Sequence, residues 1–197
     1  MKVLVACEFS GIVRDAFLAR GHDAWSCDLL PTESPGPHIQ DDVLEILNDG
    51  WDMMIAHPPC TYLATSANRW FINNPERWKK RLSAIIFVHD LLSCNIKKIC
   101  IENPKGVITS HIRKADQYIQ PYEFGHPEPK LTGLWLKNLP ELRPTNIVDP
   151  EYLLYNSKRT KSGKSRYSRF GKLGSGHGKE RSVFFKGIAD AMADQWG

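Results

Sequence analysis

The sequence predicts an α/β fold in which helices cover both faces of a mostly parallel sheet. Short β-branched or apolar runs in the first half alternate with stretches whose apolar residues recur at helical spacing, and this alternation is typical of such folds. Glycine, proline or acidic residues follow the ends of the apolar runs, where α/β folds bind their ligands. With 197 residues, 42% hydrophobic and 24% charged, the chain has the composition of one globular domain spanning residues 1–197.

The elements of the first half can be placed in order. We predict strands at residues 2–6, 23–27, 51–56 and 97–102, and helices from residue 12 to a stop at Gly21, over residues 43–47 and over residues 75–93. The long helix begins at Pro75, because proline is favoured in a first turn. In the second half, residues 120–125 and 132–136 resemble a pair of strands, and residues 183–196 form an amphipathic closing helix.

Several classes of protein do not fit this sequence. No apolar stretch is long enough to span a membrane, and the apolar run before Glu8 is too short for a secretory signal. The five cysteines form no CxxC pair and no cluster with histidines, which argues against a disulfide scaffold and against a metal site. These features indicate a cytoplasmic protein of a bacterium or of a phage-infected host cell.

Positive charge is concentrated near the C-terminus. Residues 156–197 contain ten lysines and arginines but three acidic residues, a net charge of +7, whereas residues 1–155 contain 16 basic and 19 acidic residues, a net charge of −3. Residues 156–181 are also rich in glycine and serine, and Tyr167 and Phe170 lie among them. This composition predicts a flexible segment that contacts a polyanion such as nucleic acid; a solvated loop is the alternative.

Two residues at strand ends are candidates for catalysis. Cys60 follows Pro58 and Pro59, which stiffen the backbone and hold the thiol in one direction, so that a thiolate there could act as a nucleophile. Glu102 ends an apolar strand and is followed by Asn103 and Pro104, a setting in which a carboxyl can have a raised pKa and donate a hydrogen bond. A small buried cysteine and a solvated carboxylate are the structural alternatives.

Three short motifs at strand ends resemble those of a known family. Phe9-Ser10-Gly11, Pro58-Pro59-Cys60 and Glu102-Asn103-Pro104, in this order, are similar to the motifs of DNA (cytosine-5) methyltransferases, above all the small phage or prophage members. The resemblance is good over residues 1–104, weaker to residue 145 and vague beyond, until the C-terminal helix. It implies a Rossmann-like S-adenosylmethionine-dependent methyltransferase fold and, by analogy, protection of DNA from restriction.

The resemblance also implies a mechanism. Cys60 would attack carbon 6 of a cytosine, so that carbon 5 becomes a nucleophile and takes a methyl group from S-adenosylmethionine. Glu102 would hold the ring through N3 and the exocyclic amine. Loss of the carbon-5 proton and elimination of Cys60 would then release 5-methylcytosine. On double-stranded DNA the cytosine would have to flip out of the duplex to reach the thiol.

For the cofactor, the resemblance assigns the turn Phe9, Ser10 and Gly11 to the methionine moiety of S-adenosylmethionine. Asp28 would bind the ribose hydroxyls, Asp42 the adenine amine, and Pro58 would line the pocket. Asp41 competes with Asp42 for its role. The alternatives are a surface turn for Asp28 and helix capping for Asp42.

The chain departs from the family pattern in three places. Gly11 is followed by Ile12-Val13-Arg14 where the family has further glycines, and the family's Arg-x-Arg element is replaced by Lys130 and Thr132, or by Arg143. A large target-recognition domain is also missing, which predicts short or relaxed sequence recognition by the basic segment. The residues that we expect to contact DNA are Arg69, Lys130, Lys158, Arg159, Lys164, Arg166 and Arg169, and Trp70 could close over the flipped base with Arg69.

Three other functions remain open. The enzyme could modify cytosine in RNA or in a free nucleotide, or use a modified S-adenosylmethionine. The chain could also be an inert nucleic-acid-binding protein with the same fold, although Cys60 and Glu102 are intact. Methylation of an exocyclic amine fits less well, because the corresponding motif has an aromatic residue after Pro-Pro where this chain has Cys60.

Overall fold

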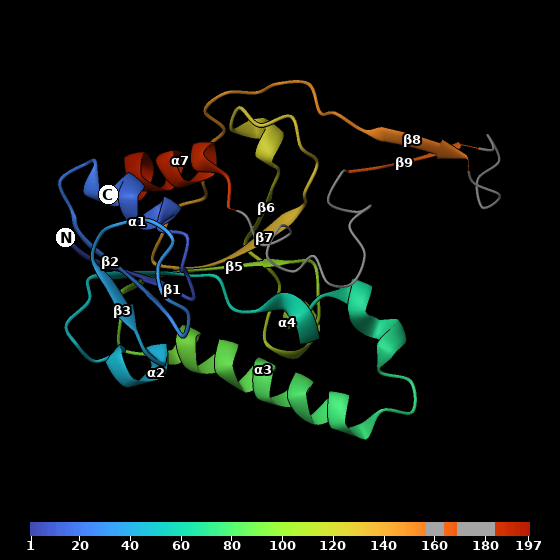
Figure 1. The fold of residues 1–197 in the computed structure, drawn as a ribbon, viewed down its shortest axis with the longest axis horizontal. Coiled ribbons are helices and arrows are strands. Elements are labelled where there is room, and N and C mark those ends of the chain that lie inside the picture. Colours follow the sequence, from blue (N-terminus) through green and yellow to red (C-terminus); the bar gives the residue numbers. More distant parts are fainter. Residues whose placement is uncertain (157–163, 169–183) are drawn as a thin grey trace.

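The computed structural model describes residues 1–156, 164–168 and 184–197. Its centre is a seven-stranded sheet with the order β3-β2-β1-β4-β5-β7-β6 (Figure 1). The first five strands are parallel, whereas β7 runs antiparallel to β5 and β6. The strands are β1 (Lys2–Ala6), β2 (Asp23–Asp28), β3 (His38–Gln40), β4 (Met53–Ala56), β5 (Lys98–Pro104), β6 (Gln117–Ile119) and β7 (Thr132–Lys137).

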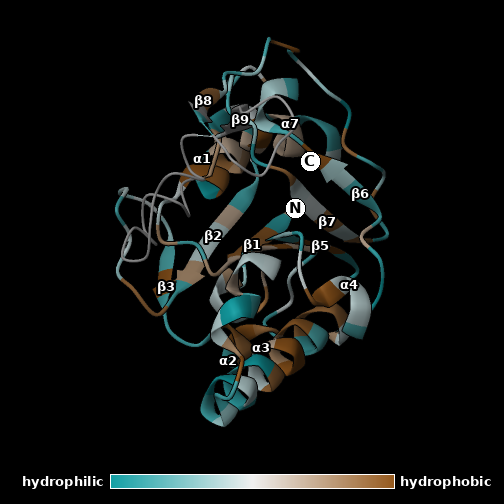
Figure 2. Ribbon diagram, turned by 90° about the vertical axis from the view of Figure 1, so that its right-hand side faces the viewer, coloured by the Kyte–Doolittle hydropathy of each residue, from teal (hydrophilic) through white to brown (hydrophobic). Residues whose placement is uncertain are grey.

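Helices cover both faces of this sheet, as Figure 2 shows. On one face lie α1 (Ile12–Leu18) and α7 (Lys186–Trp196), and on the other α2 (Val43–Ile46), α3 (Pro75–Ser93) and α4 (Ile108–His111). Alternate side chains of β1 point to opposite faces of the sheet, each of which has its own hydrophobic core. Val3 and Val5 pack with α1 and α7, whereas Leu4 packs with α2 and α3. The predicted α/β fold, with its mostly parallel sheet covered on both faces, is therefore confirmed.

The second half differs from the prediction at one predicted strand. Residues 121–123 form the 3₁₀ helix η3 (Pro121–Glu123) rather than the middle of a strand. Proline cannot donate to a strand ladder, and the carboxylate of Glu123 accepts a hydrogen bond from the amide of Gln120 at 2.7 Å, while the amide of Glu123 donates to the carbonyl of Gln120 at 3.0 Å. The strand that pairs with β7 is instead β6, which ends just before this turn.

A second, two-stranded sheet lies outside the main one (Figure 1). It consists of β8 (Leu153–Asn156) and β9 (Lys164–Tyr167), which pair antiparallel. Part of the basic segment of residues 156–181 thus takes part in a strand pair. In the part of the chain that the structure describes, no helix is long and apolar enough to cross a membrane.

Candidate active site

The predicted functional residues gather where β1, β2, β4 and β5 end. Backbone hydrogen bonds join these ends, since the amide of Glu8 donates to the carbonyl of Cys27 at 3.1 Å and the amide of His57 donates to the carbonyl of Ala6 at 2.9 Å. Cys60 follows β4, and Glu102 lies in the neighbouring strand β5. The parallel arrangement therefore brings the two candidate catalytic residues to one edge of the sheet.

Cys60 is held in a tight turn after two prolines. It begins the 3₁₀ helix η1 (Cys60–Tyr62), and its carbonyl accepts hydrogen bonds from the amides of Leu63 and Ala64 at 3.0 and 2.9 Å. The side-chain amide of Asn103, 1% exposed, donates to the carbonyl of Pro58 at 2.7 Å. The Asn103 that follows Glu102 therefore anchors the backbone that leads to Cys60, and the thiol is half-buried.

The segment after Cys60 is joined to the segment after β5. The amide of Val107 donates to the carbonyl of Leu63 at 2.8 Å, and the amide of Thr65 donates to the carbonyl of Lys105 at 3.2 Å. Between these bonds the backbones touch at Gly106, where a β-carbon would overlap the carbonyl oxygen of Leu63. We call these paired segments, residues 63–65 and 105–107, the clasp.

A Gly106→Ala variant is expected to lower the free energy of unfolding by about 1–3 kcal/mol, because the added methyl group must push the Leu63 backbone away. Urea denaturation measures this change. As a control, Lys105→Ala removes an exposed side chain next to it and is expected to change stability by less than about 0.5 kcal/mol. Equal stability of the two variants would show that the close approach at Gly106 is not needed.

Glu102 forms an ion pair with His57, a residue whose role the sequence did not reveal. The distance from His57 Nδ1 to Glu102 Oε2 is 3.2 Å, and the two side chains are 13% and 14% exposed. Burial raises the pKa of the Glu102 carboxyl, but the hydrogen bond and charge of His57, then the charge of Lys130 and the hydroxyl of Thr132, outweigh burial and lower the pKa overall. The expectation of a raised pKa for Glu102 is therefore wrong.

Lys130 and Thr132, the predicted replacements for the Arg-x-Arg element, both lower the pKa of Glu102. Thr132 begins β7, pairs with Pro104 of β5, and donates its hydroxyl to the carbonyl of Lys130 at 3.1 Å. The ammonium of Lys130 also lies 5.5 Å from the centre of the Phe185 ring. Arg143 is exposed, and its backbone is bonded to Gln195 near the end of α7. Of these candidates, Lys130 and Thr132 are the ones that interact with Glu102 in the part of the chain that the structure describes.

The turn after β1 is closed by the carboxylate of Glu8. One oxygen accepts from the amide of Val13 at 2.7 Å and from the Ser10 hydroxyl at 3.2 Å, and the other accepts from the amide of Arg14 at 3.2 Å. Gly11 has a φ of 77°, a left-handed conformation that favours glycine, and the chain turns there into α1. The first amides of α1 are thus occupied by a side chain of the protein itself, which is 4% exposed.

A Glu8→Gln variant is expected to lose about 1–3 kcal/mol of stability, because an amide group can no longer accept all of these buried hydrogen bonds. The midpoint of urea unfolding checks this. Glu45→Gln makes the same exchange at an exposed site in the first turn of α2 and is expected to cost less than about 0.5 kcal/mol. If both variants unfold alike, the Glu8 carboxylate does not support the turn.

The predicted cofactor acids lie around the end of β1. Burial raises the pKa of the Cys7 thiol, and so do the nearby charges of Asp28, Cys27 and Asp42. Burial likewise raises the pKa of Cys27 to about 11, and the charges of Asp28, Asp41 and Asp42 add to it. The carboxyls of Asp28, Asp41 and Asp42 therefore lie near one another, around Cys7 and Cys27.

Each predicted cofactor acid also has a local role. Asp28 accepts from the amide of Leu30 at 2.9 Å, as in a surface turn. Asp42 caps α2 by accepting from the amide of Leu44 at 3.0 Å, and Asp41 accepts from the amide of Asp42 at 2.8 Å.

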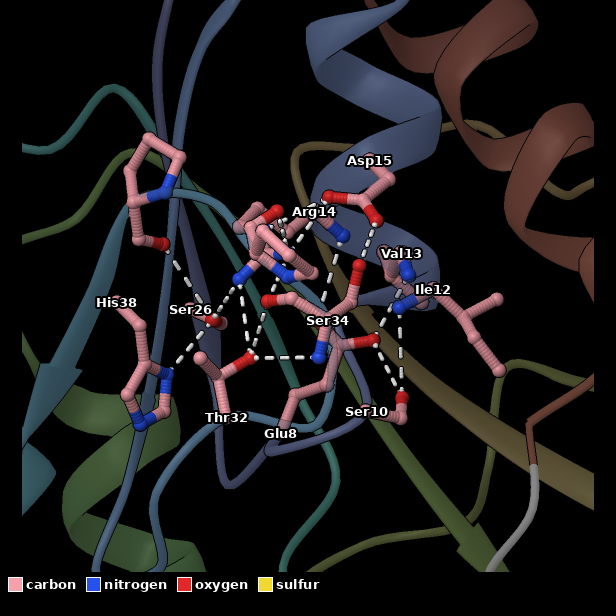
Figure 3. A network of polar contacts seen from close by, with 12 residues as sticks. Glu8, Ser10, Ile12, Val13, Arg14, Asp15, Ser26, Thr32, Ser34 and His38 are labelled. Carbon is pink, nitrogen blue, oxygen red and sulfur yellow. Dashed lines mark hydrogen bonds and ion pairs between the residues drawn. The ribbon is translucent and has the colours of Figure 1, made fainter.

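A buried arginine that the sequence did not single out organises the loop between β2 and β3. Arg14 is completely buried and ion-paired with Asp15 at 2.8 Å (Figure 3). Its guanidinium donates to the hydroxyls of Ser26 and Thr32 and to the carbonyls of Ser34 and Pro35, at 3.0–3.3 Å. Arg14 thereby ties α1, β2 and this loop together beside the predicted cofactor residues.

Arg69 and Trp70 lie in the 3₁₀ helix η2 (Thr65–Trp70), beyond the clasp. Both are exposed, and the Arg69 guanidinium lies 4.8 Å from the centre of the Trp70 ring. The segment is held to α3 by the buried Arg81, which donates to the carbonyl of Tyr62 and to the side chain of Asn68, each at 2.8 Å. These positions suit contact with a ligand at the surface.

The basic segment is described only in part. Lys164 and Arg166 belong to β9, where Lys164 pairs with Asn156 and Arg166 with Leu154. The predicted DNA contacts Lys158, Arg159 and Arg169 lie outside the described residues. Among the described residues no group of His, Cys, Asp and Glu could hold a metal ion.

The chain was compared with known families, curated proteins and solved structures. No family model matches the sequence, and no curated protein matches it. A solved E. coli structure described as a "putative DNA modification methyltransferase encoded within prophage" is similar at 17% sequence identity with a TM-score of 0.43. The similarity covers 75% of this chain and 51% of that chain, so this chain spans about half the length of that protein.

Proposed function

We propose that the protein is an S-adenosylmethionine-dependent DNA methyltransferase that methylates carbon 5 of cytosine through a covalent bond to Cys60. The observation that carries this proposal is the joint placement of Cys60 and Glu102. Cys60 follows β4, Glu102 lies in the adjacent parallel strand β5, and Asn103 bonds the proline turn that leads to the thiol. A nucleophile held in a fixed turn and an ionised, largely enclosed carboxylate on the neighbouring strand suit addition to an electron-poor ring whose nitrogens need a partner.

The residues around β1 fit S-adenosylmethionine better than a dinucleotide. In dinucleotide-binding folds the first amides of the helix after the first strand bind a pyrophosphate. Here the carboxylate of Glu8 occupies the amides of Val13 and Arg14, and its charge would repel a phosphate. Asp28 and Asp42 provide acceptors for ribose hydroxyls and an adenine amine, while the turn at residues 9–11 and Pro58 would complete the pocket.

The bound cofactor supplies an electrophilic methyl group. The thiolate of Cys60 adds to carbon 6 of the cytosine, which breaks the aromatic conjugation and makes carbon 5 nucleophilic. Glu102 holds the ring at N3 and at the exocyclic amine, with Lys130 and Thr132 beside it. After loss of the carbon-5 proton, elimination of the Cys60 thiolate restores the ring and frees the enzyme.

DNA is the substrate that the charge distribution favours. The net charge of +7 over residues 156–197 suits a phosphate backbone, and the exposed Arg69 and Trp70 could contact a flipped base or its neighbours. A free nucleotide would not need a basic segment of this length. RNA has the same phosphate groups as DNA, so parallel methyl-transfer reactions distinguish the two substrates.

The test is transfer of a methyl group followed by identification of the product. Wild-type protein is incubated with S-adenosylmethionine and DNA, and the digested nucleosides are analysed by mass spectrometry for 5-methyldeoxycytidine. DNA that contains 5-fluorocytosine should trap the protein covalently, because the fluorine cannot leave as a proton does; methylation of the exocyclic amine would give no such adduct. Parallel reactions with RNA, with free nucleotides and with a modified S-adenosylmethionine test the other substrates and donors. Absence of both transfer and cofactor binding would leave an inert nucleic-acid-binding protein.

A further inference from the structure

His57 occupies an enclosed position directly behind Glu102. It follows the last residue of β4, and its amide is bonded to the carbonyl of Ala6 in β1. Its ring packs against the ring of Phe184, with the ring centres 4.6 Å apart, and Nδ1 is 3.2 Å from Oε2 of Glu102. The other ring nitrogen, Nε2, is buried and has no hydrogen-bond partner among the described residues. Among the described residues, the His57 ring therefore makes its polar contact with Glu102.

Three further groups face the carboxylate of Glu102. They are the ammonium of Lys130, the hydroxyl of Thr132 and the thiol of Cys100 on the same strand. Lys130 and His57 both favour the ionised carboxylate. An ionised carboxylate can accept a hydrogen bond from the exocyclic amine of cytosine, but it cannot give a proton to N3.

Addition of a thiolate to carbon 6 creates a need for that proton. The electron pair of the double bond moves toward N3, which becomes basic and requires a proton if the adduct is to be neutral. Among the groups named above, histidine is the one that ordinarily changes charge near neutral pH. The proton on Nδ1 of His57 also lies in the hydrogen bond to the oxygen of Glu102 that would carry it onward.

We propose that His57 is a positioning residue that acts through Glu102 and supplies the proton that N3 of the cytosine takes up. As the Cys60 sulfur bonds to carbon 6, the carboxylate of Glu102 accepts the Nδ1 proton of His57, which becomes a neutral imidazole, and the same proton passes on from the carboxyl oxygen to N3. When Cys60 is eliminated, N3 returns the proton by the same route and the imidazolium is restored. The carbon-5 proton leaves separately to solvent, so protons and charge balance. This inference rests on the proposed function.

A His57→Asn variant tests it, because the asparagine amide can still donate to Glu102 but cannot release a proton. We measure kcat for wild type and variant across pH and take their ratio, in which the titration of Cys60 cancels. The ratio is expected to be about 100 near about pH 6 and to fall below about 5 near about pH 9, because a proton-supplying role is lost once an imidazole is neutral. His89→Asn makes the same exchange at an exposed histidine of α3 and is expected to match wild type.

A ratio that stays constant with pH would mean that His57 is only structural and would overturn the proposal. If wild-type protein transfers no methyl group at all, the proposed function fails, and the proton-supplying role fails with it. The pairing itself is then tested by ¹³C NMR of the Glu102 carboxyl in the protein without DNA. Its resonance should respond to two titrations in wild type and to one in His57→Asn; an unchanged titration would show that the two side chains do not interact.

Discussion

A Cys60→Ser variant is expected to lose methyl transfer to DNA by about 10⁴-fold or more, because a serine hydroxyl is a far weaker nucleophile than a cysteine thiolate. The mass gain on deoxycytidine should disappear, and so should the covalent adduct with 5-fluorocytosine DNA. Mass spectrometry of digested DNA and denaturing gel electrophoresis of the trapped protein measure the two effects separately.

Two controls distinguish loss of chemistry from loss of fold. Cofactor binding measured by calorimetry should be unchanged in Cys60→Ser, since the thiol is expected to contact the base. Cys94→Ser places the same exchange at the end of α3, where the thiol bonds the carbonyl of Leu91, and should retain transfer. Retention of 5-methylcytosine by Cys60→Ser would remove this residue from the mechanism.

An Arg14→Met variant is expected to lower the free energy of unfolding by about 3–5 kcal/mol, the largest stability effect predicted for this chain. Methionine fills much of the volume but donates nothing to the hydroxyls and carbonyls that the guanidinium satisfies. The loop between β2 and β3 should then separate from α1. Urea denaturation measures the stability, and hydrogen exchange shows whether the protection lost is centred on this loop.

Arg20→Met is the matched control. Arg20 is also an arginine of the α1 region, ion-paired with Asp190 and Asp194 of α7, but its side chain is 25% exposed. Exposed pairs contribute little, so a cost of about 1 kcal/mol or less is expected. Arg14→Lys should recover only part of the stability, because a lysine cannot reach all of the acceptors at once. Equal losses for Arg14→Met and Arg20→Met would show that the buried network has no special role.

The sequence predicts the parallel core and its functional edge because both follow from local patterns. Alternating strand and helix periods dictate a parallel sheet, and a parallel sheet gathers its strand ends, so Cys60 and Glu102 could be placed near each other without coordinates. The pairings across that edge could not be found in this way. His57 is distinguished from a solvated histidine by its contacts with Glu102 and Phe184, and Arg14 by the acceptors that surround its guanidinium, and these contacts come from distant parts of the chain.

The errors have the same origin. The pKa of Glu102 was expected to rise because burial alone could be read from its apolar strand, whereas the partners that lower it come from two other segments of the chain, at His57 and at residues 130–132. The predicted strand over residues 120–125 was favoured by its flanking turns, but Pro121 and the capping pair of Gln120 and Glu123 favour a helical turn. In both cases a contact distant in sequence, or a local bond between side chain and backbone, decided the outcome.

The clasp separates the turn that holds Cys60 from the exposed segment that contains Arg69 and Trp70. Cys60 and its 3₁₀ turn lie before it, fixed to β5, while Arg69 and Trp70 lie beyond it and are tied to α3 by the bond from Arg81 to Asn68. The outer part is held by more than this bond, because the adjoining Phe71 is buried and packs against Arg81 and Trp78 of α3. The exposed Arg69 and Trp70 thus rest on α3, whereas the turn that holds the Cys60 thiol is anchored to β5 through Asn103.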